Sequence, residues 1–226
     1  VGGGTEPVPG FGIRATLLPL DQLNIQRVHG RDEFVPPLQS FQGWFGDEGP
    51  RELSVPARGG IGKPILRGTR FVGADSNCEF VREVHCDGLV EYSLVSAREK
   101  GDGDLLYPAW VVGLVANAIC AAEKVRLAAG APDVEYGFEF ELCASGGPMP
   151  IAGYGDYPYR TFESLPEGQT IFPRYSLGST SEFNQITALL EQDIWDACGY
   201  ISSGHDKPLQ IDFAAALTNL GLISAE

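Results

Sequence analysis

The clearest pattern of hydrophobic and polar positions lies between Asp133 and Cys143, where the two kinds of residue alternate. Successive side chains of a β-strand point to opposite faces, so this alternation predicts a strand with one buried face and one exposed face. The apolar side comprises Val134, Tyr136, Phe138, Phe140 and Leu142. The opposite side carries Asp133, Glu135, Glu139 and Glu141.

A β-hairpin is predicted between residues 78 and 96. Asp87-Gly88 separates two strand-like segments, Cys78 to Cys86 and Leu89 to Ser96, and Asp-Gly is typical of a two-residue hairpin turn. With such a turn Arg82 faces Ser93, and Arg82 and Glu91 lie on one face. The other face then holds Val81, His85, Val90, Tyr92 and Leu94, and both faces are partly apolar. We therefore expect the hairpin to be central in its sheet.

Two long helices are predicted. The first begins at Pro108, which suits the first turn because its missing N–H costs nothing there, and it ends before Gly130. The second follows Ser179–Glu182, has apolar residues at helical spacing from Phe183 to Ala197, and ends at Gly199.

The rest of the chain predicts shorter elements around this core. Strands are expected at Ile13 to Leu20, Ile65 to Val72 and Thr170 to Ser176, and residues 30–62 are expected to be irregular chain held by aromatic side chains. We predict an α+β fold, a mostly antiparallel β-sheet with two long helices packed on it. Residues 1–64 are interpreted as an extended Gly/Pro-rich lead-in packed on the core, and residues 65–226 as the α+β core domain.

Composition favours a globular cytoplasmic protein. Of 226 residues, 43% are hydrophobic and 20% are charged. We find no segment with the ~18 apolar residues of a membrane span and no pattern of a signal peptide. Five cysteines without a Cys-x-x-Cys pair and three scattered histidines favour free thiols over disulfides or zinc. We expect no membrane association, no metal and no cofactor.

Charge is distributed unevenly. The net charge is −14, and residues 131–226 hold 14 acidic residues against 3 basic ones. Such a surface repels phosphate, so we do not expect this domain to bind nucleic acid itself. One segment differs, because no acidic residue occurs between Leu53 and Ala74. Its four basic residues are candidates for a nucleic-acid or partner contact: Arg58, Lys63, Arg67 and Arg70.

The acidic strand face is the candidate for chemistry. Glu135, Glu139 and Glu141 share it, and carboxylates about 7 Å apart along a strand could hold Mg²⁺ or Mn²⁺ in a nuclease. A solvated strand face is the simpler interpretation, because the following residues supply no Lys, His or Asp. Neither a complete phosphate-binding loop nor a Gly-x-Ser-x-Gly turn occurs. We therefore predict no catalytic residue.

Three stretches together resemble a known family. They are Cys86 to Tyr92, Leu106 to Tyr136, and Phe183 to Gly199 with Asp193-Ile194-Trp195-Asp196-Ala197-Cys198-Gly199. Their order is similar to the C-terminal region of bacterial proteins that carry an N-terminal Schlafen-like, Alba-type DNA-binding domain. The opening Val1-Gly2-Gly3-Gly4 resembles the end of such a domain. The resemblance implies that DNA binding belongs to a preceding part of a longer chain, which would be this domain's partner.

The sequence thus leads to two functional hypotheses. The first is a non-catalytic accessory domain that senses a ligand, binds a partner or forms a homo-oligomer within a larger DNA-binding protein. The second is a metal-dependent nuclease or hydrolase that uses the acidic strand face.

Overall fold

The segment with the clearest alternation forms strand β8 (Tyr136–Ser145), and its apolar side chains are buried as predicted. It belongs to an α+β fold with mainly antiparallel sheets and two long helices packed on the largest sheet, which confirms the predicted fold class. The structure is a computed structural model that describes residues 10–47, 49–56, 59–74, 78–97, 105–153, 160–200 and 207–224.

The largest sheet has the strand order β11-β8-β1-β7-β6-β5-β4, and β12 also pairs with β8. Neighbouring strands are antiparallel throughout. Besides β8, the strands of this sheet are β1 (Gly10–Pro19), β4 (Gly62–Ile65), β5 (Gly68–Ala74), β6 (Cys78–His85), β7 (Val90–Ala97), β11 (Gly168–Ile171) and β12 (Tyr175–Leu177).

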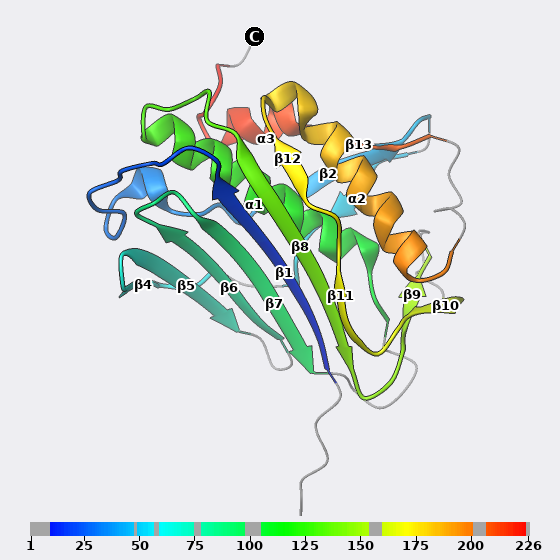
Figure 1. Cartoon of the computed structure of the whole chain (residues 1–226). Helices are drawn as coiled ribbons and strands as arrows, with labels where there is room; N and C mark the ends of the chain where they lie inside the picture. Colours follow the sequence, from blue (N-terminus) through cyan, green and yellow to red (C-terminus); the bar gives the residue numbers. More distant parts are fainter. Residues whose placement is uncertain are drawn as a thin grey trace, which may run out of the picture.

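Strand β1 lies between β7 and β8, at the centre of this sheet (Figure 1). Its inward-facing side chains are fully part of the core: Phe11, Ile13, Ala15 and Leu17. The predicted division into a lead-in of residues 1–64 and a core of residues 65–226 therefore does not follow the sheet. Gly and Pro on both sides of β1 change the local composition, but composition does not decide which strands become neighbours.

The predicted hairpin forms from β6 and β7 and is central in the sheet, but its predicted register is wrong by one residue. Val84 pairs with Val90 and Arg82 with Tyr92. The His85 N–H donates to the Leu89 carbonyl, which leaves a three-residue loop with Gly88 at φ +89°. A shift of one residue changes which side chains of β6 and β7 share a face of the sheet. Arg82 therefore lies on the buried face and Glu91 on the opposite one.

Helix α1 (Pro108–Ala128) is buried on all sides. Sixteen of its 21 residues are buried, so it differs from an amphipathic surface helix with a single apolar stripe. It contacts β1 and β7 of the main sheet on one side and strand β3 (Arg51–Leu53) and helix α2 (Phe183–Ala197) elsewhere. At Gly113 a Cβ atom would lie 3.0 Å from backbone atoms of Leu53 and Ser54. A side chain there would push the second layer away from α1.

That second layer contains a three-stranded sheet in the order β13-β2-β3. The helices and this sheet lie on one side of the main sheet (Figure 1). No helix in the described ranges is long and apolar enough to cross a membrane. The remaining elements are η1 (Asp32–Phe34), β2 (Phe41–Phe45), β9 (Met149–Ala152), β10 (Arg160–Leu165), η2 (Thr180–Glu182), β13 (Leu209–Ile211) and α3 (Phe213–Asn219).

The chain between η1 and β2 is held by polar side chains from three elements. The Asn117 amide on α1 accepts from the Gln39 N–H and donates to the Gln39 carbonyl, both at 2.9 Å. Arg82 on β6 donates to the Pro36 carbonyl at 2.6 Å, and the Tyr92 hydroxyl donates to the Pro37 carbonyl at 2.6 Å. The sequence indicated aromatic anchoring of residues 30–62. Buried Phe34 fits that view, but the hydrogen bonds define where the chain lies.

We predict that Asn117→Leu destabilises the protein by roughly 2–4 kcal/mol, because it removes the Asn117 partner of the partly buried N–H and carbonyl of Gln39. Leucine has nearly the same size, so the loss would come from hydrogen bonding and not from a cavity. Urea unfolding of this variant and of Gln185→Leu, at an exposed position on α2, measures the difference. Equal urea midpoints for the two variants would contradict a stabilising role of the Asn117–Gln39 hydrogen bonds.

Glu191 is a buried carboxyl group on α2. Only 3% of the residue is exposed, and the Trp195 indole N–H donates to its Oε1. Burial raises the pKa of Glu191 from 4.5 to about 7, although the indole hydrogen bond opposes that shift. Between pH 4.5 and about 7, the folded protein therefore keeps a proton on Glu191 that the unfolded chain has released.

Stability contributed by Glu191 is thus present below about pH 4.5 and is lost as the pH rises to about 7, by roughly 3 kcal/mol in total. We predict that Glu191→Gln stabilises the protein at pH 8 and has little effect at pH 4.5. Denaturant midpoints at the two pH values test this, with exposed Glu52→Gln as control. A Glu191→Gln effect that does not depend on pH would refute it.

Candidate functional site

The face of the main sheet that points away from α1 carries no helix of the described chain, and we call it the open face (Figure 1). The strand registers place on it every second residue of each strand. Nine large hydrophobic side chains are exposed in the described part of the protein. Six of them lie on the open face or on residues that directly extend its strands: Leu18, Leu20, Ile61, Val72, Val95 and Ile171.

A shallow groove of about 400 Å³ crosses the open face where the edge of the sheet is interrupted. Strand β11 pairs with the second half of β8 and β12 with its first half. Between them Phe172 still donates its N–H to the Phe140 carbonyl at 3.1 Å, and the ladder is interrupted at Pro173, since Pro lacks the N–H needed to continue it. Arg174 follows and contacts Glu139 on β8. The groove is therefore bounded by β1, β8 and the segment that joins β11 to β12.

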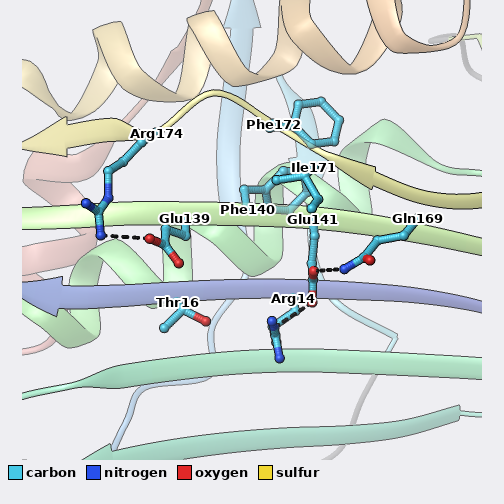
Figure 2. Close-up of a pocket in the computed structure, with 9 residues that line it drawn as sticks. All are labelled: Arg14, Thr16, Glu139, Phe140, Glu141, Gln169, Ile171, Phe172 and Arg174. Carbon is cyan, nitrogen blue, oxygen red and sulfur yellow. Dashed lines mark hydrogen bonds and ion pairs between the residues drawn. The ribbon is translucent and has the colours of Figure 1, made fainter.

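Two ion pairs fill the floor of this groove, as Figure 2 shows. The Arg14 Nε atom lies 2.6 Å from Glu141 Oε1, and an Arg174 terminal nitrogen lies 2.7 Å from Glu139 Oε1. The Gln169 side-chain amide also donates to Glu141. Both carboxylates are thus neutralised by arginines from other strands or loops.

The structure therefore brings together two of the three predicted acidic residues. Glu139 and Glu141 share the groove, whereas Glu135 precedes β8 and contacts Ser176 at 3.5 Å. Among the described residues no group of three or more His, Cys, Asp or Glu side chains is arranged to hold a metal ion. The arrangement has arginines where a two-metal nuclease site would have further carboxylates.

A second group of charges lies on β5, β6 and β7. Glu83 is nearly buried and contacts Arg70 Nε at 2.5 Å and His85 Nε2 at 3.0 Å. Glu91 is directly opposite Glu83 in the register. Burial raises the pKa of Glu91; the nearby Arg14 lowers it, and Glu83 raises it further. Unlike Glu83, Glu139 and Glu141, Glu91 has no arginine in direct contact among the described pairs.

The predicted basic residues gather on the β4–β5 hairpin. Lys63 and Arg70 face each other across the two strands, and exposed Arg67 lies in the turn with φ +57°. Arg58 lies outside the described residues. Because Arg70 already pairs with Glu83, only Lys63 and Arg67 extend from this hairpin without an ion pair in the described contacts.

Sequence reasoning missed Arg14, Arg174 and the exposed aliphatic residues of the open face. Arg14, Thr16 and Leu18 alternate with the buried side of β1, so the period-two pattern could have assigned them to the exposed face. Arg174 had no such signal, because its contact with Glu139 depends on the interruption at Pro173.

Comparison with protein-family models, curated proteins and solved structures gives no match. The resemblance to Schlafen-like, Alba-type proteins accordingly stays a prediction, and the functional argument depends on the open face itself.

Proposed function

We propose that this chain is a non-catalytic accessory domain that binds a macromolecular partner through its open face. We place it in a cytoplasmic bacterial protein whose DNA-binding activity belongs to a preceding domain, as the resemblance implies. The sensing of a small ligand is the weaker version of this proposal, because the groove is shallow and its polar groups already bond to one another.

The observation that carries the proposal is the concentration of exposed aliphatic side chains on one face. Val95 is 60% exposed and Ile171 is 74% exposed. Single exposed hydrophobic residues are ordinary on protein surfaces. A set of six on one sheet face of a chain with net charge −14 is the pattern of an interaction surface.

The alternative is a metal-dependent nuclease or hydrolase that uses the acidic strand face. Its candidate ligands Glu139 and Glu141 are each paired with an arginine. To bind a metal they would have to exchange a charge-assisted hydrogen bond for a metal bond, and the positive arginines would repel the ion. The ion pairs therefore support a structural role for these carboxylates.

We predict no metal-dependent hydrolysis by the purified chain. Nucleotides and single- and double-stranded DNA and RNA would be incubated with Mg²⁺, Mn²⁺ or Zn²⁺, alongside Glu139→Gln and Glu141→Gln. The three proteins should give the same background signal. Turnover by the unmodified chain that either variant abolishes would overturn the non-catalytic proposal.

A direct test of the binding surface uses a photoreactive amino acid at position 95 in the cell. Position 189 on α2 is the control, because Leu189 is also an exposed aliphatic residue (49%) but lies away from the open face. We predict a discrete cross-linked species from position 95 and none from position 189, identified by mass spectrometry. The same result at both positions would contradict a role for the open face.

A further inference from the structure

Charges on the open face are segregated by strand. Counting outward from the middle strand β7, the next strands are β1 and β6, and then β8 and β5. Strand β1 presents Arg14, and β6 presents Glu79 and Glu83. Strand β8 presents the acidic pair of the groove, and β5 presents Arg70. Strands at equal distance from β7 therefore carry opposite charges.

A two-fold axis parallel to β7 would bring strands of opposite charge from two copies of the chain together. Such an axis places β1 of one copy over β6 of the other and β8 over β5, because it exchanges the two sides of the middle strand. Glu139 would face Arg70 of the second copy at the same level along the strands, since both lie in the cross-strand row that contains Thr16, Glu91 and Glu83. This contact would be added to the ion pairs that Glu139 and Arg70 already make within their own chain. An isologous contact needs this kind of self-complementarity.

Three of the six exposed aliphatic residues, Val95, Ile171 and Ile61, fit the same symmetry. Val95 is on β7, so it would meet its own counterpart near the axis. Ile171 on β11 would face Ile61, which directly precedes β4, because β11 and β4 are the two outermost strands. Both isoleucines are more than 70% exposed, and burial of each against the other removes apolar surface from water.

The size of the face is sufficient for a dimer. Seven strands spaced ~4.8 Å apart give a width of ~29 Å, and six residues along the central strands give a length of ~20 Å. The outermost strands β4 and β11 have four residues each. The area is at most about 600 Å² per copy, or about 1,200 Å² in total, which is the range of a weak, reversible interface. Among the described residues, four basic and five acidic side chains nearly balance on this face, whereas the whole chain carries −14: Arg14, Lys63, Arg70 and Arg174 against Glu79, Glu83, Glu91, Glu139 and Glu141. The net charge of the face itself is therefore small.

We propose that the open face binds a second copy of this chain, face to face, about a two-fold axis along β7. The inference rests on the proposed function and names the partner. Opposite charges on strands related by the axis, and aliphatic residues that meet across it, favour a second copy over nucleic acid, whose phosphates the net charge repels.

Sedimentation velocity across a micromolar concentration series tests the dimer. We expect reversible dimerisation of the unmodified chain, and an increase of at least about tenfold in Kd for Val95→Glu, which would bring two carboxylates together near the axis. Leu189→Glu, which adds the same charge on α2, should leave Kd unchanged. Circular dichroism and thermal unfolding confirm that each variant is folded.

A charge exchange tests the geometry. Arg70 and Glu139 lie about 19 Å apart within one chain, four strand spacings away, so they cannot pair intramolecularly. We expect Arg70→Glu to weaken the dimer and the double variant Arg70→Glu/Glu139→Arg to recover part of the loss, because the exchange also removes the Arg70–Glu83 and Arg174–Glu139 ion pairs within each chain. Glu91→Gln should strengthen the dimer, because Glu91 would face its own counterpart across the axis.

A monomer at the highest concentration, or equal effects of Val95→Glu and Leu189→Glu, would overturn the second-copy inference. Failure of the double variant to recover Kd would overturn the axis along β7. A cross-link from position 95 to a different protein, together with a monomeric chain, would refute the second copy while supporting the proposed function. Absence of any cross-link at position 95 would count against both.

Discussion

The burial of α1 on every side is the constraint on which the rest of the structure depends. A helix without a polar face needs cover in all directions, and no single sheet can provide it. The main sheet covers one side, and β3, α2 and the chain after η1 cover the others. Small residues such as Gly113 allow the second layer to approach within van der Waals distance of the helix backbone. Since all this cover lies on one side of the main sheet, the opposite face stays open.

Two asparagines show how irregular or short segments are fixed against these helices. Asn117 on α1 bonds to both backbone groups of Gln39, and Asn184 on α2 does the same for Ile211. A carboxamide presents a donor and an acceptor side by side, so it can replace a neighbouring strand for one residue. The segment before β2 and strand β13 thus gain a defined position where the sheet hydrogen bonds alone would not define one.

The open face combines two properties that would conflict in an active site. Its carboxylates in the groove are neutralised by Arg14 and Arg174, which removes the free negative charge that a metal or a general base would require. Its aliphatic residues remain in water, which costs free energy unless a partner covers them. Both properties support the proposal that this surface binds a partner.

The sequence by itself determined the elements whose pattern is local. Alternation from Tyr136 to Leu142 correctly assigned the two faces of β8, and Pro108 and Gly130 correctly bounded α1, because side-chain period and terminal residues act within a few positions of the chain. It also placed Glu139 and Glu141 on one exposed face. Only the tertiary structure decided which strands are neighbours: β1 entered the centre of the sheet, and the loop at Gly88 shifted the β6–β7 register by one residue. Arg14 contacts Glu141 because β1 pairs with β8. Hydrophobic periodicity specifies which way a side chain points along its own strand, but pairing between distant strands depends on how the layers close over α1.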